Sequence, residues 1–545
     1  MCSISGIIVK ENQIPAKYSI DMMKILKHRG KDGSGLLLDD EVIYFKNFED
    51  IEDLENETIK NLSLAHNRLA IVGRYGVQPI PNEDETIWLV CNGEIYNYIE
   101  LREYLKQNHE FRTDSDNEVI IHLYEEEKLK ELDGDYAFAL YDKSNNTLLL
   151  ARDTFGVKPL FYIDTDNYFA FASERKALWH LLINISGYKK DLDELNSKIK
   201  TLKPNSQLIY YLDNNKFEII EGIKKIEVNY IGMDKIEYEN AKKCLDRALK
   251  KAVLKRVRGL DKVGVICSGG VDSSLIAKLS SLYCEVILYA VGTENSEDLI
   301  YAERLAKDLN LKLRKKIISE EEYEKYVFKV AKAIDEVDLM KIGVGIPIYV
   351  ASEMANKDGL KVVLSGQGAD ELFGGYARHE RIYKEKGEEE LKKELLKDVN
   401  NLYKVNLERD DHCTMANGVE LRVPFLDEEV VEIALSIPVD YKMSELSNRP
   451  YAESNISVKS EPINGLKNTN LNTKCIRSVR KKILRDVASQ YLPDYIAYRP
   501  KKAAQYGSGG EKMIYKVAKK YGFSKKRINE FLDMLKRKII NEINK

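Results

Sequence analysis

Apolar residues follow two different patterns along this chain. Up to about residue 210, short apolar runs alternate with polar turns, and runs such as Ser3–Val9 and Trp88–Val90 are typical of strands entering a core. From Tyr238 onward, apolar runs alternate with longer segments of helical periodicity, as in Val263–Ile266, Leu275–Tyr283 and Glu285–Gly292. Regular alternation of strand and helix predicts a parallel, doubly wound sheet with ligands at the carboxyl ends of its strands.

One of these predicted strands stops abruptly at a glycine pair. Residues 262–275 read KVGVICSGGVDSSL, so a strand, a glycine turn and a helix start gather backbone N–H groups around one point, which favours an anion. Ser268 and Ser273 add hydroxyl donors, whereas Asp272 would repel phosphate unless a cation lies between them. The segment therefore predicts a phosphate site with Mg²⁺. It lacks the lysine of a Walker loop, and a serine-rich helix cap is the alternative.

A later strand, at residues 361–364, ends in a similar way. It is followed by SGQGADELFGGY at residues 365–376. Because the carboxyl ends of parallel strands meet at one edge of a sheet, Asp370 can face Asp272 and share the magnesium ion. Two unrelated capped helices are the alternative interpretation.

The second residue of the chain is a cysteine. Removal of the initiator methionine would leave Cys2 with a thiol and a free α-amine, whose pKa is about 7.7 to 8, so one residue would hold nucleophile and base. The alternative is a cysteine without a catalytic role. The chain has 7 cysteines without a C-x-x-C pair or a histidine at zinc spacing, so neither a disulfide framework nor a structural metal is indicated.

Several polar segments in the same half could serve such a nucleophile. Asn92 and Gly93 end a predicted strand, and an Asn side chain beside a glycine N–H can form an oxyanion hole. Arg68 lies on another predicted strand. The segment around Asp116 opens a helix with acidic residues suited to an amino group. A surface ion pair for Arg68 and a helix N-cap for Asp116 are the ordinary alternatives.

Taken together, residues 2–210 resemble the glutaminase domain of the class II glutamine amidotransferases. The resemblance rests on HRGKDGSG at 28–35, LAHNRLAIVG at 64–73, CNGEIYNY at 91–98, LDGDYAFALYD at 132–142 and RDTFGVKPLF at 152–161. It implies an α+β fold, the N-terminal-nucleophile hydrolase sandwich of two sheets between helical layers. It also implies that Cys2 attacks the glutamine amide, that Asn92 and Gly93 hold the oxyanion, that Arg68 binds the α-carboxylate, and that Asp116 with Glu94 binds the ammonium. Ser3 and Lys31 depart from the usual Gly and Pro.

The glycine loop of the second half resembles that of the PP-loop ATP pyrophosphatases. With a glutaminase in front, and with ELRVPFLD at 420–427 and RPKK at 499–502, the chain resembles the glutamine-hydrolysing asparagine synthetases. The resemblance implies that ATP activates the aspartate side chain as an acyl-adenylate, that ammonia from glutamine then attacks it, and that Lys501 stabilises the transition state. Asp272 and Asp370 would bind Mg²⁺. The implied ATP-binding residues are Ile266, Ser268, Gly269, Gly270, Asp272, Ser273, Val291, Ser365 and Gly366.

The sequence also predicts domain boundaries and leaves alternative functions open. We expect a glutaminase domain at 1–210, a connecting segment at 211–240 and a Rossmann-like α/β synthetase domain at 241–545, with a mobile insertion at 444–474. Gln367 and Gly343–Gly345 depart from the family pattern near the acceptor site. A related PP-loop amidotransferase acting on another carboxylate therefore stays open, as do a tRNA-modifying enzyme with a basic tail and a non-catalytic binding protein.

Composition narrows the partners. The net charge is -3 and charged residues make up 32% of the chain, which gives no reason to expect nucleic acid. The chain shows no signal peptide and no apolar run of about 18 residues, so we expect a cytoplasmic protein without a membrane segment. The expected small-molecule partners are glutamine, aspartate and ATP, and the resemblance suggests a homodimer.

Overall fold

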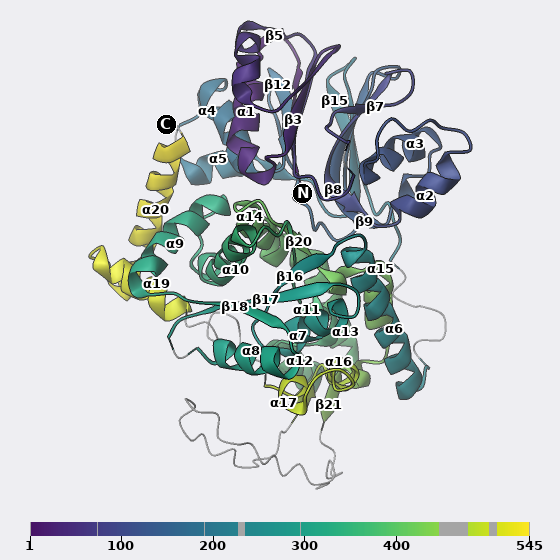
Figure 1. Ribbon diagram of the computed structural model, residues 1–545. Helices are drawn as coiled ribbons and strands as arrows, with labels where there is room; N and C mark the ends of the chain where they lie inside the picture. Colours follow the sequence, from purple (N-terminus) through teal and green to yellow (C-terminus); the bar gives the residue numbers. More distant parts are fainter. Residues whose placement is uncertain are drawn as a thin grey trace.

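The computed structural model describes residues 2–73, 75–189, 191–226, 235–294, 296–445, 478–500 and 510–543. Lys501 and nearly all of the insertion predicted at 444–474 lie outside these ranges. Figure 1 shows two halves stacked on one another, with the start of the chain between them.

The first half contains two antiparallel sheets that face one another. The strand order is β13-β11-β12-β1-β6-β3-β4 in one sheet and β15-β14-β10-β9-β8-β7 in the other. The strands of the first sheet are β1 (Ser3–Val9), β3 (Gly33–Leu38), β4 (Glu41–Phe45), β6 (Leu62–Arg68), β11 (Phe161–Asp164), β12 (Tyr168–Ala172) and β13 (Lys200–Thr201). Those of the second are β7 (Ile80–Pro81), β8 (Ile87–Ile95), β9 (Gly134–Asp142), β10 (Thr147–Arg152), β14 (Ser206–Tyr211) and β15 (Lys216–Glu221).

Helices cover the outer face of each sheet. Helices α1 (Lys17–Leu26) and α4 (Arg175–Asn184) lie outside the first sheet, and α2 (Tyr98–Leu105) and α3 (Val119–Glu125) lie outside the second (Figure 1). Alternate side chains of a strand point to opposite faces. Ile4 and Ile8 accordingly pack between the sheets while Ile7 joins the cluster that contains the α1 residues. This double burial explains the wholly apolar end of β1, and the predicted four-layer sandwich is confirmed.

The second half is built on a five-stranded parallel sheet of order β18-β17-β16-β19-β20. Its strands are β16 (Lys262–Ile266), β17 (Glu285–Gly292), β18 (Lys312–Ile317), β19 (Val362–Leu364) and β20 (Glu420–Arg422). Its principal helices are α6 (Tyr238–Val257), α7 (Val271–Ser280), α8 (Glu297–Asp308), α9 (Glu320–Ala333), α10 (Leu339–Lys357), α13 (Glu388–Leu402), α14 (Glu408–Met415), α15 (Glu428–Ser436), α16 (Lys482–Ala488), α19 (Gly510–Lys520) and α20 (Ile528–Ile543). The predicted doubly wound parallel sheet is confirmed.

Strand β15 lies inside the segment predicted to connect the two domains. It pairs with β14 along its whole length, so the second sheet extends to Glu221. As an edge strand, β15 leaves most of its side chains in solvent. This exposure accounts for the polar composition that resembles a linker.

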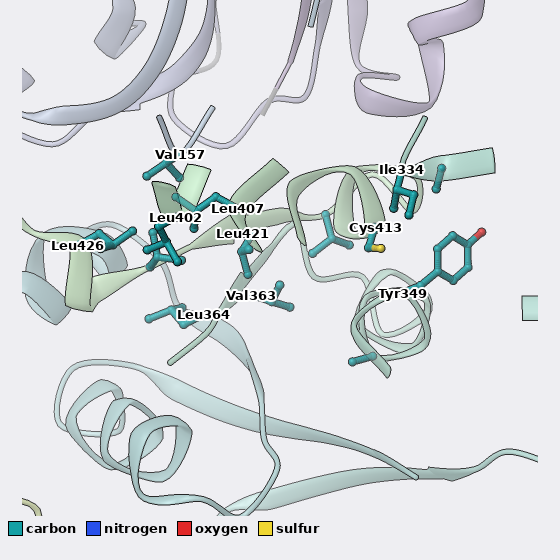
Figure 2. Close-up of a cluster of buried hydrophobic side chains, with 14 of the residues drawn as sticks. Val157, Ile334, Tyr349, Val363, Leu364, Leu402, Leu407, Cys413, Leu421 and Leu426 are labelled. Atoms are coloured by element: carbon teal, nitrogen blue, oxygen red, sulfur yellow. The ribbon is translucent and has the colours of Figure 1, made fainter. Parts of the chain in front are cut away.

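The two halves share one continuous hydrophobic core. Figure 2 shows Val157, from the first half, beside Leu402 and Leu407, with Leu421 of β20 next to them. The core therefore joins the edge of the parallel sheet to the sandwich. Within the residues that the structure describes, no helix is long and apolar enough to cross a membrane.

Candidate active site

Cys2 lies immediately before β1, where the two sheets of the sandwich meet. Its backbone nitrogen donates to Asn92 Oδ1 at 3.1 Å, and its carbonyl oxygen accepts from Arg29 Nε at 3.1 Å. Asn92 belongs to β8 of the opposite sheet, so both sheets are needed to form this contact. Burial raises the pKa of the Cys2 thiol, so the resting sulfur is protonated and needs a base beside it.

The Asn92 side chain is oriented by the contact with Cys2. Its carboxamide oxygen is engaged, while its Nδ2 is buried and has no hydrogen-bond partner among the described residues. A buried donor without a partner is costly in a folded protein, which favours a ligand atom at that position. Gly93 follows, and a Cβ there would lie 2.6 Å from the Asp135 carbonyl oxygen, so only glycine fits. This geometry is compatible with an oxyanion hole at Asn92 and Gly93, which stays a prediction.

Two buried carboxylates, those of Glu94 and Asp116, lie beside Asn92 and Gly93. Asp116 Oδ2 accepts the Ile95 N–H at 2.8 Å, and Glu94 Oε2 lies 3.1 Å from Arg422 Nη2. Burial raises the pKa of Glu94 to about 8 and that of Asp116 to about 6. An ammonium group bound here would restore the charged forms, as expected for the amino end of glutamine. The N-cap of the short helix that contains Asp116 is Ser115, so capping does not account for Asp116.

Arg68 ends β6 on the same side of the sandwich. The side chain is buried, and its Nη2 donates to the Gly73 carbonyl oxygen at 2.8 Å. Arg68 thus holds the loop after β6 in this structure. A guanidinium at that position has the geometry to bind a carboxylate with two parallel hydrogen bonds.

The predicted phosphate loop joins β16 to α7. Gly269 has a φ of +65°, and a Cβ there would lie 2.6 Å from Tyr301 Cβ, so this turn requires glycine. Arg499 fixes the loop from the other end of the chain, since its Nη1 donates to the Ser268 carbonyl oxygen at 2.8 Å and its Nη2 pairs with Asp298 at 2.8 Å. Arg499 therefore ties the loop to α8, which contains Asp298.

Asp272 and Asp370 converge as predicted, but a lysine lies between them. Lys481 Nζ is 2.8 Å from Asp272 Oδ2 and 2.5 Å from Asp370 Oδ1, and its side chain is buried. Lys481 also has a φ of +59°, a conformation that non-glycine residues rarely adopt outside functional sites. Sequence reasoning missed this residue because it lies in an ordinary basic run with no diagnostic spacing.

The two carboxylates of Asp272 and Asp370 could also bind a magnesium ion. Two carboxylates that converge at the end of parallel strands are the oxygen donors that Mg²⁺ prefers alongside phosphate. The ammonium of Lys481 compensates the same two charges in the structure. The donor set therefore fits the predicted metal.

Strand β20 connects the two predicted sites. Arg422 pairs with Glu420 at 2.6 Å and with Glu94 of the sandwich at 3.1 Å. Its carbonyl oxygen accepts from Ser365 N at 3.1 Å. The next residue, Gly366, packs so closely that a Cβ there would lie 2.8 Å from Asp272 Cβ. The contacts thus run from the predicted glutamine pocket to the predicted phosphate loop without a break.

The remaining predicted nucleotide residues lie at the same sheet edge. Ile266 ends β16, Val291 lies near the end of β17 and Ser365 follows β19. The three strands are adjacent and parallel in the sheet, so these residues gather at their carboxyl ends. This is the place where open parallel sheets bind ligands.

Two residues that depart from the family pattern, Gln367 and Gly345, pack against other side chains in the structure. Gln367 Nε2 donates to Asp410 Oδ2 at 2.6 Å, and Asp410 is also paired with Arg409. Gly345 lies in α10, where a Cβ would lie 2.9 Å from Val330 Cγ1 and 3.0 Å from Cys413 Sγ. Close helix packing therefore explains the glycine at this position.

Fold and site together define a glutamine amidotransferase coupled to an ATP-dependent ligase. A family model described as "Glutamine amidotransferase domain" matches residues 53–219, and one described as "Asparagine synthase" matches residues 244–387 and 383–534. The chain belongs to the family of glutamine-hydrolysing asparagine synthetases.

Curated relatives extend across most of the chain. A "Putative asparagine synthetase [glutamine-hydrolyzing] 1" of Methanocaldococcus jannaschii is 90% identical over 542 residues, covering 99% of this chain and 100% of that protein. An "Asparagine synthetase [glutamine-hydrolyzing]" of Sandersonia aurantiaca is 31% identical, covering 93% and 87%. The corresponding enzyme of Bos taurus is 30% identical, covering 82% and 77%.

Proposed function

We propose that this chain synthesises asparagine from aspartate and ATP, with glutamine as the nitrogen source. One observation carries the proposal. Cys2 is buried beside Asn92, whose Nδ2 has no hydrogen-bond partner among the described residues, and this pair is joined through β20 to a loop with two convergent carboxylates. Glutamate, AMP and pyrophosphate are the other products.

Hydrolysis of glutamine begins at Cys2. After the initiator methionine is removed, the Cys2 nitrogen becomes an α-amine that takes the thiol proton as the sulfur attacks the side-chain amide. The Asn92 Nδ2 and the Gly93 N–H hold the oxyanion, and the amine returns the proton to the leaving ammonia. Arg68 binds the α-carboxylate, and Glu94 with Asp116 binds the ammonium. Water then cleaves the thioester and releases glutamate.

Activation of aspartate takes place at the phosphate loop. The backbone of Gly269 and Gly270 and the hydroxyls of Ser268 and Ser273 receive the phosphates, with the adenosine bordered by Ile266, Val291, Ser365 and Gly366. Asp272 and Asp370 would hold Mg²⁺, which would supply charge neutralisation at the phosphates. Lys481 contributes a further positive charge to the pyrophosphate. Lys501, outside the described residues, is proposed to stabilise the transition state.

The ammonia passes between the two sites inside the protein. Ammonium formed in bulk water would be no nucleophile, and the junction at β20 is buried along Glu420, Leu421 and Arg422. Water exclusion at this junction supports transfer of neutral ammonia. The AMP and pyrophosphate products follow because the carboxylate attacks the α-phosphorus of ATP.

Cys2→Ala tests the division of labour. We expect this variant to lose glutamine-dependent asparagine synthesis and to keep synthesis from added ammonia, since the nucleophile acts only in the first half. Chromatography of the nucleotide products is the second measurement. Loss of both activities, or release of ADP and orthophosphate instead of AMP and pyrophosphate, would refute the proposal.

The identity of the acceptor has its own test. Gln367 departs from the family pattern near the acceptor site, which keeps a different carboxylate as the second candidate. Exchange of pyrophosphate into ATP should be stimulated by aspartate and not by glutamate or other acids. Stimulation by another carboxylate alone would favour the second candidate.

The same proposal includes a domain division, an oligomeric state and a cellular location. We place the domain division near residue 221, where the second sheet ends, with the synthetase domain from about residue 238. A homodimer is favoured by the resemblance and is testable by sedimentation of the purified chain. A cytoplasmic location fits the free cysteines and the use of ATP.

A further inference from the structure

Two histidines and two glutamates converge on the outer side of the second sheet, apart from the residues assigned to glutamine. Glu83 lies in the loop between β7 and β8, and His109 lies in the loop that follows α2. His122 and Glu125 lie one turn apart on α3 and so share one face of that helix. One ligand atom from each of the four lies within 4.8 Å of every other.

Four of the six separations between these atoms are near those expected for a tetrahedral zinc site. For ligands about 2.1 Å from a tetrahedral zinc ion, neighbouring ligand atoms are about 3.4 Å apart. His109 Nδ1 is 3.4 Å from both Glu83 Oε1 and Glu125 Oε2. His122 Nδ1 is 2.9 Å from Glu125 Oε2 and 3.9 Å from Glu83 Oε1. Both imidazoles thus direct Nδ1 at the same two carboxylates.

Neighbouring groups orient these four side chains. Asn82 Nδ2 donates to Glu125 Oε1 at 2.9 Å, and the Glu110 N–H donates to Glu83 Oε1 at 2.9 Å. His109 Nε2 lies 3.5 Å from Glu126 Oε1, so its outer nitrogen faces a carboxylate. The hydrogen bonds from Asn82 and Glu110 hold the two carboxylates in place, as outer partners of metal-binding carboxylates do.

Two of the nearby carboxylates lack a lysine or arginine partner in the ranges that the structure describes. Glu126 is paired with Lys128 at 2.7 Å, whereas within the described part of the chain Glu83 and Glu125 are paired with the two histidines alone. His122 is fully buried, and its Nε2 has no hydrogen-bond partner among the residues described. A divalent cation among these side chains would compensate the two carboxylates.

We propose that Glu83, His109, His122 and Glu125 bind one zinc ion. Two imidazole nitrogens and two carboxylate oxygens suit Zn²⁺ better than Mg²⁺ or Ca²⁺, which prefer six or more oxygen ligands. Four protein ligands make a closed site, so the metal is structural. The proposed site contains no cysteine, so the spacing of the cysteines could not indicate it.

The proposed zinc fastens the wall of the glutamine pocket. His109 and His122 flank the segment that contains Asp116, and Glu83 ties the same segment to the loop before β8. That segment is further held by Glu118, whose carboxylate accepts the N–H groups of Arg112 and Thr113. Loss of zinc should therefore loosen glutamine binding more than ammonia-dependent synthesis.

The test uses the full-length chain without an affinity tag. After treatment with a chelator and dialysis, Co²⁺ is added as a spectroscopic probe, because a tetrahedral cobalt site absorbs strongly in the visible range. We expect one equivalent to bind, Zn²⁺ to displace it, and Zn²⁺ to raise the thermal midpoint of the metal-free chain.

Variants decide whether these four residues are the ligands. Glu83→Gln, at a side chain 35% exposed, should fold normally and lower zinc affinity about tenfold or more. His122→Gln should abolish the cobalt spectrum. His180→Gln is the matched control, since His180 pairs with Asp21 elsewhere on the surface. Absence of a cobalt spectrum in the unaltered chain, or equal zinc affinity in Glu83→Gln and the control, overturns the proposal.

Discussion

At the scale of single residues, burial sets the chemistry of the glutamine pocket. Glu94 and Asp116 are held where water cannot stabilise their charges, so the pKa of each is raised. Asn92 Oδ1 accepts a hydrogen bond from Cys2 N, whereas Asn92 Nδ2 has no partner among the described residues. Each of these residues could be predicted from its motif, because a short sequence run fixes Asn92 and Glu94 on β8 and Asp116 at the start of a short helix. Lys481 could not, because its partners lie far away in the sequence.

Glutamine binding should release protons. If Glu94 and Asp116 bind the ammonium of glutamine as proposed, that charge stabilises their ionised forms and lowers their raised pKa values, so the bound site holds fewer protons than the free site. Affinity should therefore increase as the pH rises toward about 8, the pKa of free Glu94, and level off above it. Calorimetry of glutamine binding to Cys2→Ala in buffers of different ionisation enthalpy measures the protons released. Binding that is independent of pH between 5 and 8 would contradict this assignment.

Replacing Asn92 should affect one half reaction only. Asn92→Ala removes a buried donor aimed at the oxyanion, which costs about 10²- to 10³-fold in the rate of glutamine hydrolysis. Glutamate release by the variant is the measurement. Synthesis from added ammonia serves as the internal control and should be unchanged. A loss of less than threefold would exclude Asn92 from the oxyanion hole.

At the scale of elements, close packing decides details that periodicity leaves open. Helix α10 is largely apolar, yet its sequence gives no reason for its two glycines. The structure separates them, since a Cβ at Gly343 meets only Ile514 Cδ1 at 3.3 Å, whereas one at Gly345 meets Val330 and Cys413 at 2.9 and 3.0 Å. Which face of a helix receives a neighbour depends on tertiary structure and is not encoded locally.

The two glycines of α10 should therefore respond differently to alanine. Gly345→Ala forces a methyl group into filled space and should lower the free energy of unfolding by about 1–3 kcal/mol. Gly343→Ala is the matched control in the same helix. It should be neutral or stabilising by up to about 1 kcal/mol, because alanine favours helix over glycine. Urea unfolding of both variants tests the contrast, and equal effects would argue against the packing described.

At the scale of the whole molecule, the junction between the halves depends on buried ion pairs. Arg422 joins Glu420 of its own strand to Glu94 of the sandwich, and Arg29 joins Glu174 of the sandwich to Asp411 of α14. The presence of two domains could be predicted from the change in periodicity. Their docking could not, because these pairs connect charged residues that look like ordinary surface positions in the sequence. Strand β15 could not be assigned to the second sheet from the sequence either, because its exposed residues resemble a linker.

Arg422 should couple the two reactions. Arg422→Met leaves Glu94 and Glu420 buried without their shared cation, and breaking such a pair costs about 3–5 kcal/mol. The junction should loosen locally, so that ammonia escapes and the ratio of glutamate to asparagine formed rises above that of the unaltered chain. Arg258→Met is the control, because Arg258 is 38% exposed and pairs with Glu100 on the surface. The ratio is measured by following both products in one reaction, and pyrophosphate exchange checks that the synthetase half stays folded. If exchange persists and the ratio is unchanged, Arg422 serves stability alone and the ammonia route does not depend on this junction.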